Sequence, residues 1–369
     1  MSFTGQGGIM RASVCVLVAA IGLAAHPAFA QADRTAVTFW QAVQARCDAT
    51  AAKPASELGR RIAQMAIDEF TRFGGHRIDS NGRLFHFGLT EAKHGDGGGD
   101  RQPSLGQLGW WQVLKYWRTL YGNDTLDMIE ARGYSDAASS ADGARIATLL
   151  RVDAAPLLRA VENVADPEAR EVLREAALRA AIIDTPWSAA FVSYVIRQSS
   201  VAANAFHFSN AHRDYIYEAF ATSAAELSNA ADERIYRACP PNTRPRVGDL
   251  ICHQREPALA DASEQAVRER IRAELAGSPE ARSVRRTHCD VVASIDARAH
   301  KMYGISGNVY QSVAARKLNL RRNLKFAAAQ KGNCGGSGQW TLPEPSAAPG
   351  LTGQCSLNDR KWFVLLQLR

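Results

Sequence analysis

The chain has 369 residues, of which 46% are hydrophobic and 22% charged, so it is long enough to bury a sizeable core in one large domain or two smaller ones. Its formal net charge of +7 suits an anionic partner such as a cell-wall polymer or an anionic lipid. No run of Lys and Arg is interleaved with aromatic residues, so we do not expect nucleic acid as a partner. No CxxC or HExxH spacing occurs, so we expect no zinc site, and no motif indicates a cofactor.

Residues 1–30 have the pattern of a secretory signal peptide. Arg11 precedes an apolar run from Ala12 to Ala25, and Ala28-Phe29-Ala30 supplies the small residues of a cleavage site. The run is too short to span a bilayer, and no later segment is long and apolar enough to do so. We therefore predict cleavage after Ala30 and a soluble monomer that is periplasmic or secreted.

Cysteines fit an oxidising compartment. Of the seven, Cys15 lies in the predicted signal peptide, and the rest form an even set that permits up to three disulfides. These are Cys47, Cys239, Cys252, Cys289, Cys334 and Cys355. We predict Cys252–Cys289, on neighbouring predicted strands, and Cys334–Cys355, across a loop rich in Gly and Pro.

The first half of the mature chain is predicted to be mainly helical. Residues 31–87 form an N-terminal segment, with two helices over 34–75 and a short, extended stretch after them. Residues 88–166 are expected to be a helical insertion or cap. Within it, Trp110 to Trp117 is an aromatic-rich helix, for which core packing is favoured over carbohydrate stacking.

The segment 167–369 is predicted to carry the site. Thr185 is expected to cap a central helix, with Pro186 in its first position and Ser188 about two residues further on, near the positive end of the helix dipole. Ser209 is expected to cap the next helix, which runs to about residue 223. A charged helical insertion follows at about 254–285.

Between and after these helices the apolar period changes from 3.6 to 2, which is typical of strands. The expected strands are 246–252, 288–295, 302–309, 312–320 and 362–368. A nucleophile at a helix start followed by antiparallel strands is an α+β arrangement.

Candidate partners of Ser188 come from the strand hairpin. His288 begins one strand, and Asp290 shares its face. If Ile295 pairs with Met302, a shift of one residue in register places Asn308 opposite His288. Asn308 or Asp290 can then orient the imidazole, as the third member of a catalytic triad does.

The order of these motifs resembles the papain-like cell-wall peptidases of the NlpC and CHAP type. More closely, the chain resembles domain of unknown function 2272, over roughly 58–87 and 170–320. The motifs that carry the resemblance are Pro186-Trp187-Ser188-Ala189-Ala190-Phe191-Val192-Ser193, Phe208-Ser209-Asn210-Ala211-His212, Gly248-Asp249-Leu250, His288-Cys289-Asp290 and Gly307-Asn308-Val309. The resemblance implies a papain-like core, in which a helix packs on an antiparallel sheet, with N-terminal helices and helical insertions.

The chain departs from those peptidases by carrying Ser188 where they carry a catalytic cysteine. A serine hydroxyl is harder to ionise than a thiol, so it needs a general base during attack. Our leading hypothesis is an exported hydrolase that cleaves an amide or ester bond related to peptidoglycan. Ser188 is the nucleophile, His288 the base within hydrogen-bond reach of it, and Asn308 or Asp290 the orienting residue.

The alternatives are a catalytically inactive module that binds peptidoglycan and a structural protein of the envelope; the nucleophile can also lie elsewhere. We expect Trp187, Ser209 and His212 to contact the substrate. Backbone N–H groups at the start of the central helix would stabilise the oxyanion.

Overall fold

The computed structural model describes residues 27–92, 107–135, 148–330 and 356–369, with side chains from residue 38 onward. Two compact units meet in sequence between Phe39 and Trp40. The first unit holds the beginning of helix α1 (Pro27–Ala51), and the second, Trp40–Arg369, holds every other described element. Among the described helices, none combines the length and the apolar character that crossing a membrane requires.

An eight-stranded sheet forms the centre of the second unit, in the order β2-β1-β9-β8-β7-β6-β10-β5. Its strands are β1 (His76–Ile78), β2 (Leu84–His86), β5 (Tyr236–Cys239), β6 (Leu250–Gln254), β7 (Thr287–Asp296), β8 (Lys301–Val309), β9 (Ser312–Asn319) and β10 (Lys361–Leu368). All neighbours are antiparallel except β1 and β9. The predicted combination of helices with a mainly antiparallel sheet is confirmed, and the described strands form an open sheet.

Burial explains why the last strand lies inside the sheet. In β10 every residue from Trp362 to Leu368 is buried, and the strand pairs with β6 on one side and β5 on the other. A strand that is covered on both faces typically has a continuous apolar sequence, and residues 362–366, Trp-Phe-Val-Leu-Leu, form such a run. The C-terminal segment is therefore part of the core.

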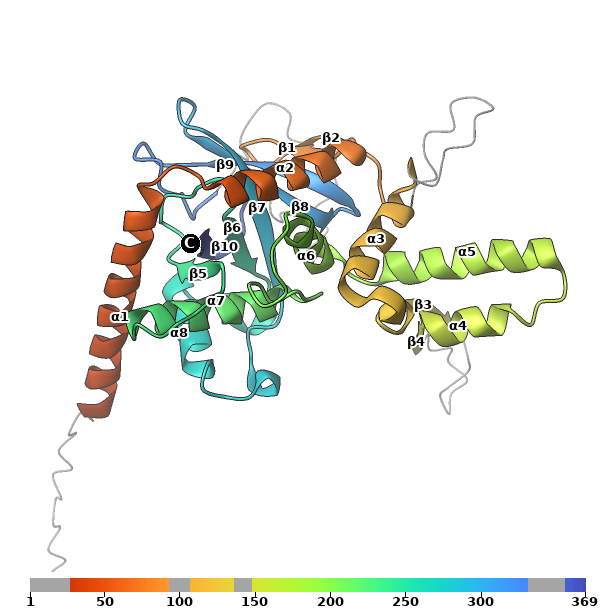
Figure 1. Ribbon diagram of the computed structural model, residues 1–369, viewed down its shortest axis with the longest axis horizontal. Helices are drawn as coiled ribbons and strands as arrows, with labels where there is room; N and C mark the ends of the chain where they lie inside the picture. Colours follow the sequence, from red (N-terminus) through yellow and green to blue (C-terminus); the bar gives the residue numbers. More distant parts are fainter. Residues whose placement is uncertain (1–26, 93–106, 136–147, 331–355) are drawn as a thin grey trace, which may run out of the picture. The chain divides into compact units, whose positions relative to one another are not determined.

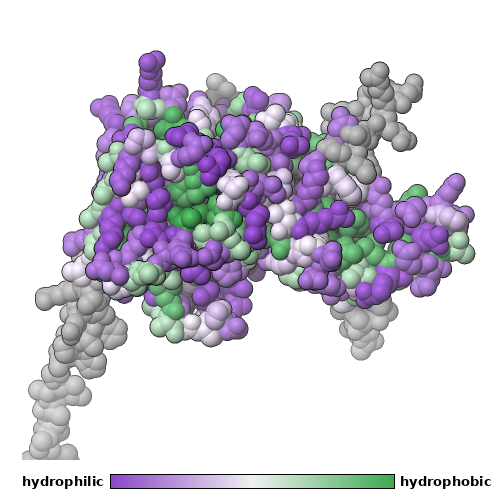
Figure 2. Space-filling model, viewed as in Figure 1, coloured by the Kyte–Doolittle hydropathy of each residue, from purple (hydrophilic) through white to green (hydrophobic). Residues whose placement is uncertain are grey.

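Helices lie over this sheet and beside it (Figure 1). They are α2 (Glu57–Arg72), α3 (Gly109–Tyr121), α4 (Ala154–Val161), α5 (Pro167–Asp184), α6 (Ser188–Gln198), α7 (His212–Leu227) and α8 (Glu264–Glu274), with short 3-10 turns at Gly122–Asp127, Pro257–Leu259 and Pro279–Ala281. Helices α2 and α6 contact β7 and β8, α7 contacts β5, and α8 contacts β10. Helices α4 and α5 contact each other, and α5 carries the exposed Val172 and Leu173. Figure 2 shows hydrophobic side chains on the part of the molecule that these helices form in Figure 1.

Helix α6 approaches β8 at Gly307, and this contact positions the start of the helix. A Cβ at Gly307 would lie 2.5 Å from the Trp187 ring and 2.6 Å from Cβ of Phe191. Real Cβ atoms do not come so close, so the approach requires glycine here. Ser188, next to Trp187, is thereby held close to the sheet.

The structure confirms most predicted elements and corrects some. The two helices expected over 34–75 are α1 and α2, and the five expected strands are present with bounds shifted by up to four residues. Residues 123–166 were expected to be helical, but they contain a hairpin of β3 (Glu130–Ser135) and β4 (Thr148–Asp153) before α4. Every residue of β4 is exposed, so no apolar alternation marks it as a strand.

Two disulfides join the described cysteines. The predicted Cys252–Cys289 bond is confirmed, between directly paired residues of β6 and β7. Cys47 of α1 is bonded to Cys239 of β5, a pair that the sequence left unassigned. The predicted pair Cys334–Cys355 and most of the predicted signal peptide lie outside the described residues, and α1 begins at Pro27, before the predicted cleavage point.

Candidate functional site

Two helix starts meet at the centre of the site. Ser188 is the first residue of α6, and His212 is the first residue of α7. Ser188 Oγ lies 2.8 Å from His212 Nε2, a hydrogen-bonding distance. Both side chains are nearly enclosed, with 7% and 4% of their surface exposed, respectively. A hydroxyl and an imidazole in contact are the arrangement that activates a serine for attack.

The start of α6 differs in detail from the prediction. Its N-cap is Trp187, which makes no side-chain capping bond, and Ser188 comes directly after it. Thr185 instead ends α5 as its C-cap, and the Thr185 hydroxyl exchanges hydrogen bonds with the main chain of Glu130. The predicted cap at Thr185 is therefore wrong, because its hydroxyl is engaged by β3. Ser188 still lies at the positive end of the helix dipole.

Ser209 fixes the turn that leads into α7. Its hydroxyl accepts from the Ala211 N–H at 3.0 Å and donates to Asp214 at 2.6 Å. Its main-chain N–H and C=O both bond to Ser193 Oγ in α6, at 3.1 and 2.8 Å. The predicted N-cap role is wrong, since Ala211 is the N-cap and α7 extends to Leu227. Ser209 instead ties α7 to α6 and so holds His212 against Ser188.

His212 is held in its neutral form. Burial, followed by the nearby His288 and Arg255, lowers the pKa of His212 well below its usual value. The two helix starts add positive potential, which also disfavours a charged imidazole. The second ring nitrogen, Nδ1, contacts the Tyr215 hydroxyl one turn along α7. A neutral imidazole that is held at both nitrogens can accept a proton from Ser188.

His288 lies behind His212 and takes part in a buried polar cluster. The His212 and His288 rings are 4.9 Å apart between centroids. His288 Nε2 lies 3.3 Å from an Asp290 oxygen, and the other Asp290 oxygen lies 3.3 Å from Arg316 Nε. Among the described contacts neither His288 nitrogen bonds to Ser188, so the predicted hydrogen bond between them is absent. His212 occupies that place because α7 begins directly against α6.

The predicted hairpin register is confirmed, including the shift. Ile295 pairs with Met302, and an irregularity just before Ser294 moves the pairing by one, so that Val292 faces Gly304. The ladder ends at Val291, before it reaches His288. Asn308 takes a positive φ of 53° at the bulge between β8 and β9. It shares a cavity with His288 but makes no hydrogen bond to it among the described contacts.

That cavity has a volume of about 230 Å³ and lies at the ends of several strands. Its lining residues are His253, Arg255, His288, Asn308, Val309, Tyr310, Arg316 and Arg360. His253 pairs directly with His288 across β6 and β7, and the sequence analysis assigned it no role. The pairing of His253 with His288 could have been predicted from the sequence. The predicted Cys252–Cys289 bond implies an antiparallel register in which the next pair is His253 and His288.

The described residues include no group of three or more His, Cys, Asp or Glu side chains that could hold a metal ion.

Comparison with known proteins gives one family: the one described as "Uncharacterized protein conserved in bacteria (DUF2272)" matches residues 105–368. The chain belongs to this family. The matched range contains the Ser188–His212 pair and the arginine-lined cavity of this DUF2272 protein. No match was found among curated proteins or among solved structures.

Trp187 has a structural place in the DUF2272 protein. Its ring is fully buried and packs on Phe73 and Tyr116, and its indole N–H donates to Glu91. The ring has no exposed surface, so the substrate contact predicted for it would require neighbouring side chains to move. Glu91 is also buried, and burial raises its pKa to about 7.

The raised pKa of Glu91 predicts a pH dependence of stability. From pH 4.5 to about 7 the unfolded chain loses a proton that the folded DUF2272 protein keeps, so the free energy of unfolding falls as pH rises. Over that range Glu91 is expected to lower stability by about 3 kcal/mol, which Glu91→Gln removes. The measurement is urea unfolding of both proteins at pH 5 and about pH 8.

Asp249, whose pKa burial also raises to about 7, is present in both proteins, so their difference isolates Glu91. Equal stability differences at the two pH values would show that Glu91 is already ionised at pH 5.

Proposed function

We propose that this protein is an exported hydrolase of the cell envelope that cleaves an amide or ester bond with Ser188 as nucleophile and His212 as general base. The observation that carries the proposal is the 2.8 Å contact between Ser188 Oγ and His212 Nε2 at two facing helix starts. The proposal moves the base from His288, which the sequence indicated, to His212.

The chemistry follows from the positions of these atoms. Ser188 Oγ attacks the acyl carbon as its proton passes to His212 Nε2, and His212 then gives that proton to the departing amine or alcohol. Water, deprotonated by the same nitrogen, releases the acid and restores the serine. In the tautomer of His212 that carries its proton on Nδ1, the Tyr215 hydroxyl accepts from Nδ1–H and Nε2 is free to act as the acceptor. The first N–H groups of α6 have no acceptor within the helix and would stabilise the oxyanion.

The proposal includes a papain-like core of the NlpC and CHAP type. Three features support it: a helix-borne nucleophile, antiparallel strands that follow it in the chain, and contact of α6 with β7 and β8. Peptidoglycan is the proposed substrate, because the resembling peptidases act on the cell wall and the net charge of +7 suits an anionic polymer.

One observation favours a second candidate, a catalytically inactive module that binds peptidoglycan. Only 7% of the Ser188 surface is exposed, so a polymer reaches its hydroxyl only if neighbouring side chains move. The arginine-lined cavity, in contrast, requires no such movement to receive an anion. Binding and hydrolysis are therefore tested separately.

The test is labelling of the purified, oxidised protein with a fluorophosphonate probe, which reacts with activated serines. Labelling of the wild type is expected and should disappear in Ser188→Ala. Ser199→Ala is the matched control, because it removes a hydroxyl that only bonds to the main chain at the other end of α6. Absence of labelling in a folded wild type, with binding to purified sacculi, would select the inactive module.

A further inference from the structure

The cavity beside His288 is strongly electropositive. Three of its eight lining residues are arginines, Arg255, Arg316 and Arg360, and none of the eight is an aspartate or glutamate. The guanidinium groups repel one another. The pKa of Arg255 is lowered first by burial and then by the nearby charges of Arg360 and Arg316. Like charges gathered around one cavity are stabilised by an anion placed between them.

Arg316 is the most buried of the three, and among the described residues its ion-pair partner is Asp290. Its side chain is buried, with Nε 3.3 Å from Asp290 and Nη1 donating to the Leu357 carbonyl at 2.6 Å. Asp290 also lies against His288, behind the cavity. Asp290 pairs with Arg316, and no aspartate or glutamate is among the eight lining residues, so the lining carries more positive than negative charge.

Buried polar atoms at the same cavity have no partner. Nδ1 of His253 and Nδ1 of His288 are buried and make no hydrogen bond within the described chain, while Nε2 of His288 lies beside Asp290. Buried polar atoms are usually satisfied, and an unsatisfied one calls for an explanation such as a bound water or ion. The two rings lie 5.2 Å apart and both line the cavity.

We propose that this cavity binds an oxyanion group, a carboxylate or a phosphate, through Arg255, Arg316 and Arg360. A volume of about 230 Å³ is smaller than the cavities that enclose a drug-sized ligand, so it suits a terminal acid group. The planar guanidinium fork matches both kinds of oxyanion. This binding does not depend on the proposed hydrolysis.

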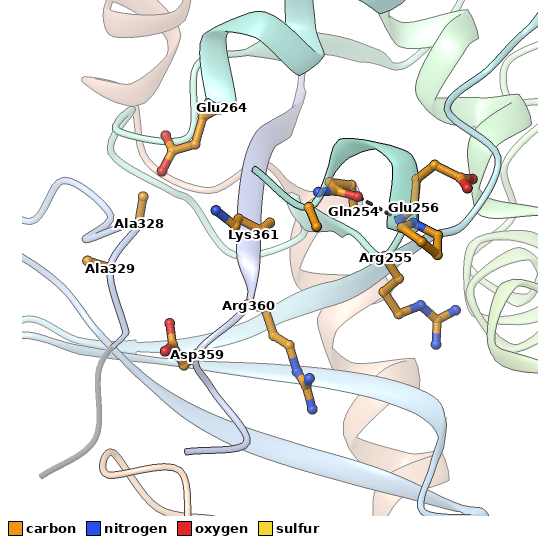
Figure 3. A pocket seen from close by; sticks show the side chains of 11 residues that line it. Gln254, Arg255, Glu256, Glu264, Ala328, Ala329, Asp359, Arg360 and Lys361 are labelled. Carbon is orange, nitrogen blue, oxygen red and sulfur yellow. Dashed lines mark hydrogen bonds between the residues drawn. The ribbon is translucent and has the colours of Figure 1, made fainter. Parts of the chain in front are cut away.

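The rest of the ligand has a place next to the cavity. Arg255 and Arg360 also line a larger, polar hollow of about 610 Å³, together with Gln254, Lys361 and three acidic residues, Glu256, Glu264 and Asp359. Figure 3 shows the side chains of Arg255 and Arg360 extending to the same side of this hollow, while Lys361 points the other way. The acid group would lie among the arginines and the polar remainder of the ligand in the larger hollow.

The test is isothermal titration calorimetry on the full-length Ser188→Ala protein, so that no turnover accompanies binding. The probes are inorganic phosphate and N-acetylalanine, a small carboxylate, in a buffer without competing anions. We expect saturable binding of one of them with a Kd of about 1 mM or below. Phosphate binding alone would assign a phosphate-bearing ligand, and N-acetylalanine binding alone a ligand that ends in a carboxylate.

Arg255→Gln and Arg360→Gln are each expected to weaken binding about tenfold. Lys361→Gln is the matched control, since it removes the same charge from the larger hollow only, and it should leave the Kd nearly unchanged. If all three variants weakened binding equally, the binding would reflect the overall positive charge of the protein and not the cavity, and the proposal would be overturned. Failure of both probes to bind the folded protein would overturn it as well.

Discussion

Replacement of His212 by glutamine is expected to slow fluorophosphonate labelling of Ser188 by about a thousandfold, the contribution of a general base. Glutamine is close to histidine in size and can still hydrogen-bond to Ser188 Oγ, but it cannot take up the proton. The measurement is the second-order labelling rate across a range of pH. Thermal unfolding of the variant shows whether the start of α7 is intact.

The pH profile of the wild type gives a second readout. Because burial and the neighbouring His288 lower the pKa of His212, the base stays neutral as the pH falls through 6.5. The labelling rate should therefore remain level there and decline only at lower pH. His288→Gln is the control, expected to change the rate less than about tenfold. Strong loss in His288→Gln with a near-normal His212→Gln would return the base to His288, as the resemblance implied.

Most of the strands could be predicted because their positions depend mainly on residues that are close together in the sequence. The sequence of β7 is rich in β-branched residues, which favour strands, and the turn between Asp296 and Lys301 sets the pairing of Ile295 with Met302. The pairing of the remaining residues of β7 and β8 follows by stepping away from this turn one residue at a time. This register brings Asn308 toward the cavity that His288 lines. Strand β5, in contrast, is four residues long and was missed because so short a run shows no period.

The Ser188–His212 pair could be predicted only in part. Ser188 stands out as a polar residue that heads an apolar helix face, but its contact with His212 spans 24 residues and depends on the angle between α6 and α7. That angle is set by Ser193 and Ser209, whose hydrogen bonds no periodicity reveals. The sequence placed His212 near the substrate and indicated His288 as the base. Residue pairing between adjacent strands can be worked out from the sequence, whereas the packing of α7 against α6 cannot.

Removal of the Cys47–Cys239 disulfide is expected to destabilise the protein by about 5 kcal/mol, since the bond closes a loop with a sequence separation of 192. Loss on this scale is a large part of the 5–15 kcal/mol, roughly, that holds a typical protein folded. The bond also fixes the end of α1 to β5, where the Cys47 carbonyl accepts from Gln367 at 3.0 Å. The measurement is urea unfolding of Cys47→Ala/Cys239→Ala at neutral pH.

The second disulfide is a matched control. All four cysteines are fully buried, so truncation to alanine costs a similar amount of packing in either pair. Cys252–Cys289 closes a loop with a separation of only 37, so its double alanine variant should be the more stable of the two by about 1.5 kcal/mol. If Cys252→Ala/Cys289→Ala were instead the less stable variant, loop closure would not be what the bonds contribute. The strain of holding His253 beside His288 without the covalent link would then be the larger effect, and the Cys252–Cys289 bond would belong to the architecture of the arginine-lined cavity.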